Sequence, residues 1–278
     1  MVFQIADLRV KVILPENYIP KLPYFNSVTA DYCVPDTALF DFKIIIGEKR
    51  TSTPKTLPAS PQSFTIVTIN AAQSWINCRT SKGKITWPKR TLQVFFYENM
   101  SEPDMLVIDY LKLIFSFLVL EKGGLPLHCS SVFKGEAALA FFGPSEAGKS
   151  TIARLFSPPW RILSDELNFI LPQNNTYMVY STPFCPKNYE LCSKSSAPLK
   201  FLFSLEKGKR NEVIDLPLSE KFKSLVFSLY TIAINDRYCQ LSFSNVIEIC
   251  RHIPVQKLSF LKNKSVVATI QGLIGDNS

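Results

Sequence analysis

The sequence lacks the patterns that mark several common classes of protein. Its seven cysteines are odd in number and scattered, and no Cys-x-x-Cys pair occurs among them. This distribution argues against a disulfide framework and against a zinc site, and it favours a reducing compartment. The first residues lack a basic segment followed by a long apolar core, so no secretory signal peptide is expected. We therefore expect a cytoplasmic protein.

The chain also lacks an apolar run long enough to cross a bilayer comfortably. Its most apolar stretch, residues 105–120, is interrupted by Asp109 and Lys112, so a buried helix is the better interpretation. The formal net charge is +8, which suits an anionic substrate, but no dense Lys/Arg run with interleaved aromatic residues occurs. We expect neither nucleic acid nor a membrane as a partner.

What the sequence does contain predicts a mixed α/β (α+β) protein of two parts. Residues 1–100 carry β-branched and aromatic runs that alternate with period two, and they predict a small, mostly antiparallel β-region without a helix. Residues 101–278 mix strands and helices and form the second expected domain. There a helix begins near Ser101 and ends before two glycines, and a tight turn at residues 134–136 joins two strands. Residues 219–234 and 265–274 predict helices, and residues 199–208 and 251–263 predict strands.

A glycine-rich loop lies between the second strand of that hairpin and an expected helix. Residues 143–151, GPSEAGKST, match G-x-x-x-x-G-K-[ST] at every fixed position. Glycines let the backbone turn several N–H groups inward, and the helix N-terminus adds unpaired donors. Lys149 can reach the β- and γ-phosphates of a nucleotide, and the Ser150 hydroxyl can ligate Mg²⁺. The expected nucleotide-binding residues are Gly143, Pro144, Ser145, Glu146, Ala147, Gly148, Lys149, Ser150 and Thr151.

Two acidic residues follow the loop after about one helix and one strand. Asp165 and Glu166 interrupt an apolar stretch, where charge is costly unless it faces a ligand or an ion. One carboxylate can hold Mg²⁺ and the other can accept a proton from an attacking hydroxyl, but both can also face solvent at a strand end. From the local sequence alone, His128 in the strand before the loop is interpreted as a core histidine rather than a catalytic one. His252 is interpreted as structural.

Taken together, these motifs resemble the HPr kinase/phosphorylase superfamily. The hairpin with His128, the loop and the strand ending in Ser-Asp-Glu are similar to that family, most of all to HPr-kinase-like proteins of lasso-peptide-type gene clusters. The resemblance extends over roughly residues 105–275. It implies a P-loop kinase core shared with phosphoenolpyruvate carboxykinases, with ATP and Mg²⁺ as cofactors. It also implies that Asp165 is the base, that Glu166 with Ser150 and Asp165 holds Mg²⁺, and that His128 and Lys149 assist at the γ-phosphate.

The chain departs from that family at two points. Glu146 stands where the family usually has glycine, and its charge weakens nucleotide affinity unless the side chain points outward. The longer C-terminal signature of HPr kinases is not evident, so HPr itself is not the expected acceptor.

We therefore expect a Mg²⁺- and ATP-dependent kinase that phosphorylates a hydroxyl, that of a Ser in a precursor peptide or protein. One alternative is a kinase of a small hydroxylated molecule such as free serine. Another is a catalytically weak nucleotide-binding sensor or regulatory protein, which Glu146 supports. A carboxykinase-type lyase ranks last because the chain is short. A homo-oligomer is left open, and the segment from Thr182 to Cys192 is either a substrate-facing loop or an ordinary connection.

Overall fold

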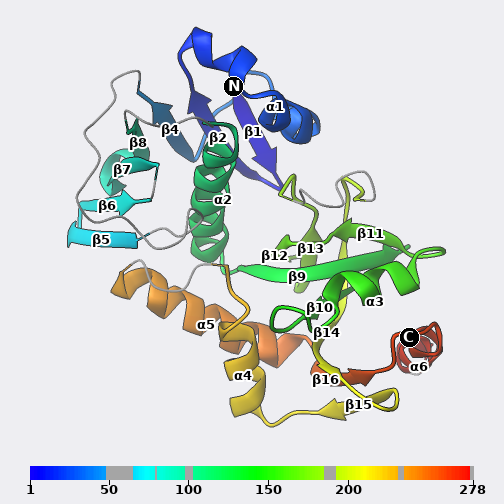
Figure 1. Cartoon of the computed structure of the whole chain (residues 1–278). Coiled ribbons are helices and arrows are strands. Elements are labelled where there is room, and N and C mark those ends of the chain that lie inside the picture. Colours follow the sequence, from blue (N-terminus) through cyan, green and yellow to red (C-terminus); the bar gives the residue numbers. More distant parts are fainter. Residues whose placement is uncertain (48–64, 79, 98–102, 185–191, 231–234, 276–278) are drawn as a thin grey trace. The chain divides into compact units, whose positions relative to one another are not determined.

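The computed structural model describes residues 1–47, 65–78, 80–97, 103–184, 192–230 and 235–275 (Figure 1). Contacts divide the chain into two compact units. The first contains Met1–Leu118 and a short segment ending at Asp236, and the second contains Val119–Ile232 and Arg237–Ser278. Each unit is built on its own eight-stranded sheet. The combination of sheets and helices confirms the expected α/β (α+β) class, while the domain boundary between residues 100 and 101 stays a prediction.

The sheet of the first unit has the strand order β3-β1-β2-β4-β8-β7-β6-β5. The pairs β2–β4 and β4–β8 are parallel, and the five other pairs are antiparallel. Side chains alternate between buried and partly exposed along β2 and β4, as their period-two sequence requires. The strands are β1 (Val2–Ile5), β2 (Leu8–Ile13), β3 (Cys33–Val34), β4 (Phe42–Ile46), β5 (Thr65–Asn70), β6 (Gln73–Asn77), β7 (Ser81–Thr86) and β8 (Thr91–Phe96).

A helix interrupts the β-region, so the expectation of a region without helices was wrong. This helix, α1 (Pro23–Thr29), begins at a proline, and the Asp104 carboxylate accepts hydrogen bonds from the amides of Tyr24 and Phe25 at 2.9 and 2.7 Å. Asp104 belongs to the first turn of α2 (Pro103–Glu121). The cap of α1 therefore comes from a distant part of the chain, where local sequence patterns do not reveal it. Three short 3₁₀ helices are η1 (Glu16–Lys21), η2 (Ala30–Tyr32) and η3 (Trp87–Lys89).

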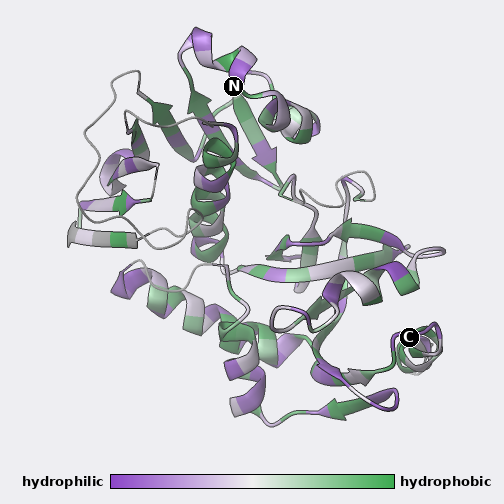
Figure 2. Cartoon of the chain, viewed as in Figure 1, coloured by the Kyte–Doolittle hydropathy of each residue, from purple (hydrophilic) through white to green (hydrophobic). Residues whose placement is uncertain are grey.

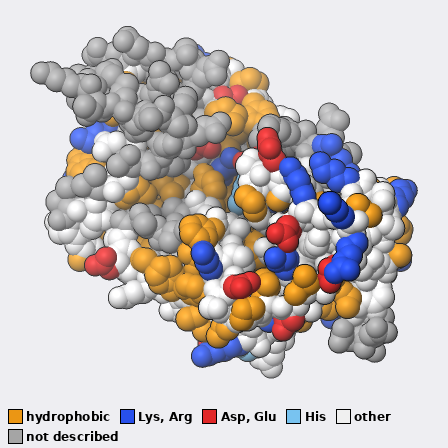
Figure 3. Space-filling view, turned by 60° about the horizontal axis from the view of Figure 1, so that its bottom comes forward, with side chains coloured by type: hydrophobic (Ala, Val, Ile, Leu, Met, Phe, Trp, Pro, Cys, Tyr) orange, Lys and Arg blue, Asp and Glu red, His pale blue; other side chains and the backbone are white. Residues whose placement is uncertain are grey.

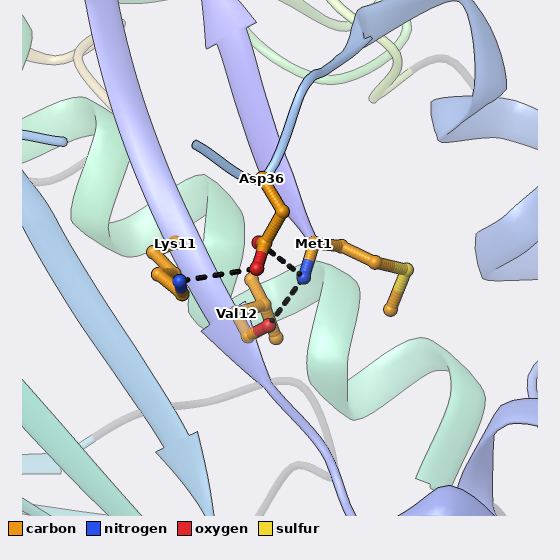
Figure 4. A network of polar contacts seen from close by, with 4 residues as sticks. All are labelled: Met1, Lys11, Val12 and Asp36. Atoms are coloured by element: carbon orange, nitrogen blue, oxygen red, sulfur yellow. Dashed lines mark hydrogen bonds and ion pairs between the residues drawn. The ribbon is translucent and has the colours of Figure 1, made fainter. Parts of the chain in front are cut away.

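The first residue of the chain is held by a small polar network (Figure 4). The α-ammonium of Met1 donates to the Val12 carbonyl at 3.1 Å and lies 3.3 Å from the Asp36 carboxylate. Lys11 reaches the same carboxylate at 3.2 Å. The hydrogen bond from Lys11, followed by that from the N-terminus, holds the pKa of Asp36 below its ordinary value. The network joins β1 and β2 to the loop that follows β3.

In the second unit, two long strands, β9 and β14, pair with different neighbouring strands along their first and second halves. The first half of β9 pairs with β12, and its second half pairs with β10 and β11. The first half of β14 pairs with β13, and the rest pairs in parallel with β10 and β16. The carboxyl ends of β10, β14 and β16 therefore meet at one edge. The strands are β9 (Leu125–Lys134), β10 (Ala137–Phe142), β11 (Arg161–Ser164), β12 (Leu167–Gln173), β13 (Thr176–Tyr180), β14 (Ser196–Lys207), β15 (Glu212–Asp215) and β16 (Val255–Phe260).

The helices of the second unit include one that the sequence patterns missed. Besides α3 (Lys149–Phe156), α4 (Leu218–Val226) and α6 (Ser265–Gly275), the chain forms α5 (Asp236–His252). Its buried face includes Ser242 and Asn245, which weaken the apolar stripe that marks a helix. In Figure 2, α4 and α5 carry both hydrophobic and hydrophilic colours. The strand expected from residue 251 was wrong at its start, because His252 ends α5. The helix expected over 219–234 ends at Val226, and residues 231–234 lie outside the described part.

Asn245 links α5 to the connection between α2 and β9. Its buried Nδ2 group donates to the carbonyls of Leu120 and Gly124, both at 2.9 Å. We predict that Asn245→Ala lowers the free energy of unfolding by about 2–3 kcal/mol, because it leaves two buried carbonyls without this donor. Urea denaturation measures the change. The exposed neighbour Ser244 bonds only within its own helix, so Ser244→Ala is the control and should change stability by less than about 0.5 kcal/mol. Equal losses would contradict the prediction.

Candidate functional site

The glycine loop has the strand–loop–helix context that the sequence predicts. It starts where β10 ends at Phe142, and α3 begins at Lys149. Gly143 and Gly148 both have positive φ angles, 143° and 105°, which favour glycine. A Cβ atom on Gly148 would lie 2.8 Å from the Phe260 ring, and one on Gly143 would lie 3.3 Å from the Leu205 carbonyl oxygen. The two glycines therefore allow the loop to turn and to pack tightly against β14 and β16.

A hydrophobic layer holds α3 in place against the sheet. Its buried residues Ile152, Ala153 and Phe156 pack in one cluster with side chains of β10, β14, β16 and α6. The ring centroids of Phe141 and Phe156 are 5.5 Å apart. This packing fixes the N-terminal end of α3, with its unpaired amide groups, at the end of the loop.

The side chain of Lys149 folds back over the loop. Its Nζ atom donates hydrogen bonds to the carbonyl oxygens of Gly143 and Pro144, at 2.9 and 3.0 Å. Partial burial lowers the pKa of Lys149, and the neighbouring Cys129 and Asp165 act in the opposite direction. The ammonium group therefore lies at the mouth of the loop, within electrostatic reach of the Asp165 carboxylate.

Asp165 and Glu166 lie in the bend between β11 and β12. The Ser130 hydroxyl on β9 donates a short hydrogen bond to Oδ1 of Asp165. The Glu166 carbonyl accepts a hydrogen bond from the Cys129 amide at 3.1 Å. The Asp165 carboxylate also acts electrostatically on Lys149. Both acidic side chains are only partly buried.

His128 is exposed on β9, between the buried residues Leu127 and Cys129. The local sequence suggested a core histidine, but His128 does not lie in the core. It pairs with Leu167 across to β12, and its amide donates to the Ser228 carbonyl at 2.8 Å. The segment after α4 therefore lies beside the start of β9. His252, exposed at the end of α5, donates from Nδ1 to the Glu248 carbonyl oxygen at 2.8 Å.

A buried polar network beneath Asp165 was not foreseen from the sequence. Asn168 donates from Nδ2 to the Cys129 carbonyl at 2.6 Å and accepts a hydrogen bond from Ser131 at 2.5 Å. Burial raises the pKa of the Cys129 thiol to about 12, so it stays protonated at neutral pH. The signal in the sequence was the pair Ser130-Ser131, two hydroxyls side by side in an apolar strand. One now supports Asp165 and the other supports Asn168.

A hollow of about 520 Å³ opens beside the loop. Its lining comes from the loop itself, from the end of β14 and from Lys257 of β16. Glu146 belongs to this lining, is exposed, and adopts a left-handed backbone with φ of 64°. Non-glycine residues adopt that conformation at a cost of roughly 1–2 kcal/mol. The lining residues are Pro144, Ser145, Glu146, Ala147, Ser204, Leu205, Glu206, Lys207 and Lys257.

Ser150, Asp165 and Glu166 are the residues whose oxygens suit a magnesium ion. Mg²⁺ prefers hard oxygen ligands and is commonly held by one or two carboxylates together with waters and substrate phosphates. Within the described ranges, no group of three His, Cys, Asp or Glu side chains lies close enough to hold a metal ion without other ligands.

Other expectations fall partly outside the described residues. In the segment from Thr182 to Cys192, Thr182 donates to the Leu167 carbonyl at 2.6 Å and Phe184 is buried, while residues 185–191 lie outside the described part. Cys185 lies there too, and the six described cysteines are free thiols. Of the helices described, none has both the length and the apolarity to span a membrane.

The fit of Gly148 against Phe260 gives a test of the loop's conformation. We predict that Gly148→Ala lowers the free energy of unfolding by about 2–4 kcal/mol, because both the positive φ and the contact with the ring oppose a side chain. Gly135→Ala is the matched control: its φ is also positive, 56°, but nothing lies within 4 Å of its Cβ position. The control should lose only about 1 kcal/mol in urea denaturation. Equal losses would mean that Phe260 does not constrain the loop.

No curated protein matches the chain. Among solved structures, it is similar to the Hpr(Ser) kinase/phosphatase from Coxiella burnetii, with 14% sequence identity and a TM-score of 0.32, over 54% of this chain and 88% of the other. The model of one protein family, described as SynChlorMet cassette protein ScmC, matches residues 97–268. This match covers more than half of the sequence, and the chain therefore belongs to the ScmC family.

Proposed function

We propose that this protein is a Mg²⁺-dependent kinase that transfers the γ-phosphoryl group of ATP to a hydroxyl. The observation that carries the proposal is the position of Lys149. Its ammonium donates to two carbonyl oxygens of a glycine loop at a helix N-terminus, and the charge of Asp165 acts on its pKa. Phosphoryl transfer to a hydroxyl needs a cation for the phosphates and a carboxylate that accepts a proton, and these two residues supply both groups.

Binding begins with an exchange of partners at Lys149. Its ammonium donates to two carbonyl oxygens of the loop, and the β- and γ-phosphates are stronger, charged acceptors for the same donors. The first amides of α3 add donors to this cradle. Because hydrophobic packing fixes α3, this cradle does not depend on the nucleotide for its position.

The proton of the acceptor hydroxyl goes to Asp165. Ser130 holds Oδ1 of that carboxylate, which orients the group towards the loop and limits its rotation. Ser150, Asp165 and Glu166 supply oxygen ligands for Mg²⁺, which when bound neutralises charge on the transferred phosphoryl group. The exposed ring of His128, on the strand that carries Ser130, assists by donating to an oxygen of that group.

The acceptor is a serine hydroxyl in a precursor peptide or protein, and the reaction belongs to the cytoplasm, where thiols such as the free cysteines stay reduced. Phosphorylation of a small molecule such as free serine is the alternative within the same chemistry. Asp165 and Glu166 are only partly buried and His128 is exposed, which suits a polypeptide acceptor, because a partly open site admits a chain.

Two substitutions test binding and chemistry separately. We predict that Lys149→Ala weakens ATP binding by roughly 10- to 100-fold, the loss expected for charge-assisted hydrogen bonds. Asp165→Asn should still bind ATP but should lose transfer of label from γ-labelled ATP to acceptors in an extract. Titration calorimetry and label transfer are the two measurements. Lys134→Ala, an exposed lysine in the hairpin turn, is the control and should match the wild type.

The outcomes separate the two roles. Transfer that survives Asp165→Asn would remove Asp165 from the role of base. ATP affinity that does not change in Lys149→Ala would overturn the assignment of the loop as a nucleotide site.

Glu146 supports a second candidate, a nucleotide-binding sensor with little turnover. Its exposed carboxylate lines the hollow at the loop, where it repels phosphates. We predict that Glu146→Gln strengthens ATP binding about fivefold, since an unscreened charge at this range contributes about 1 kcal/mol. Glu136→Gln removes the same charge from the hairpin turn and should leave the affinity unchanged. If the two variants bind alike, the charge of Glu146 does not limit affinity and the sensor loses its support.

A further inference from the structure

A cluster of lysines surrounds the carboxyl ends of β14 and β16. We call it the basic rim and define it as Lys207, Lys209, Lys262 and Lys264. Backbone and side-chain contacts hold its two halves together: the Gly208 amide donates to the Phe260 carbonyl at 3.3 Å. Asn211 accepts from the Leu261 amide at 2.8 Å and donates to Ser265 at 2.7 Å. The four lysines therefore stand on two turns that are tied into one surface.

The lysines of the rim have no ion-pair partner among the residues that the structure describes. Lys207, Lys209, Lys262 and Lys264 are all exposed. The neighbouring acidic groups are already paired, Glu206 with Lys257 at 3.1 Å and Glu212 with Arg210 at 2.9 Å. Among the residues that the structure describes, no carboxylate lies within ion-pair distance of the four lysines. Like charges gathered in this way repel one another, so the rim attracts an anionic partner.

The rim continues into the candidate site. Lys207 lines the hollow together with Lys257 and the loop residues Pro144–Ala147. Ligands of sheets with parallel strands bind at the carboxyl ends of those strands, and β10, β14 and β16 end at this edge. Figure 3, which turns the bottom of Figure 1 forward, shows Lys and Arg side chains gathered on the right of that face. A partner held by the rim would thus lie next to the phosphate loop.

We propose that the basic rim docks an acidic segment of the polypeptide whose hydroxyl is phosphorylated. This inference rests on the proposed function, and it makes the acceptor a peptide or protein with Asp and Glu residues near the modified hydroxyl. The rim consists of exposed lysines on turns, and its nearby aromatic residue Phe260 is buried. Nucleic-acid surfaces usually add exposed aromatic rings that stack on bases, so the composition favours an acidic polypeptide.

A binding experiment without nucleotide tests the rim directly. The probe is a fluorescein-labelled ten-residue peptide of Asp, Glu, Ser and Gly, and fluorescence anisotropy measures its Kd at low and at physiological salt. The triple variant Lys209→Gln/Lys262→Gln/Lys264→Gln should bind roughly tenfold more weakly than the wild type at low salt, with a smaller salt dependence. The control Lys89→Gln/Lys134→Gln/Lys223→Gln removes the same charge from exposed positions elsewhere and should bind as the wild type does.

Each outcome of these measurements either supports or contradicts the proposed role of the rim. Equal affinity of the rim variant and the control would overturn the proposal, as would a single-stranded oligonucleotide of the same charge that displaces the peptide at a much lower concentration. ATP titration runs in parallel. If the wild type binds ATP but its peptide binding does not depend on the rim lysines, the proposal for the rim is wrong and the proposed kinase function is not affected. Absence of ATP binding in the wild type, with rim-dependent peptide binding intact, overturns the kinase and leaves an acidic-peptide binding surface.

Discussion

The contact of Gly148 with the Phe260 ring is the constraint on which the site depends. A glycine at that point lets the loop pass close to β16, where any side chain would meet the ring at 2.8 Å. The close approach sets the start of α3 against the sheet, and the start of α3 places Lys149. The Lys149 ammonium then closes the loop through the carbonyl oxygens of Gly143 and Pro144. Packing in the hydrophobic layer thereby determines where the ammonium group of Lys149 lies.

The strands β9 and β14, which each pair with different neighbours along their two halves, place the other parts of the site on opposite sides of that loop. β9 carries Ser130, and through its pairing with β11 and β12 it brings the bend with Asp165 to one side. β14 runs parallel to β10 on the other side, and its end forms the hollow and the basic rim. The proposed chemistry and the proposed docking of an acidic segment are therefore separate in the sheet. A polypeptide acceptor has to pass across the loop to reach both.

Local sequence predicted those parts of the structure whose causes are local. The hairpin of β9 and β10, the glycine loop and α3 follow from alternating apolar residues, a turn glycine and a glycine motif of fixed spacing. α1 was missed because its cap, Asp104, comes from another part of the chain. α5 was missed because Asn245 on its buried face serves the carbonyls of Leu120 and Gly124 instead of packing as an apolar residue. Ser130 and Asn168 gain their roles only when β9, β11 and β12 pair.

Glu146 is the point at which the local rules and the site disagree. Its backbone takes a left-handed conformation that favours glycine, and it lines a hollow beside the loop that we propose as a phosphate site. Neither feature stabilises the loop, because glycine would relieve both the strain and the repulsion. The residues around the hollow carry compensating charge, however: Lys207 and Lys257 line it together with Glu146 and Glu206, and Lys257 pairs with Glu206 at 3.1 Å. A hollow with both signs of charge selects a ligand less by net charge than by the arrangement of its charges. In the proposed function, Glu146 therefore acts against phosphates that lie outside the cradle, while the ammonium of Lys149 holds those within it.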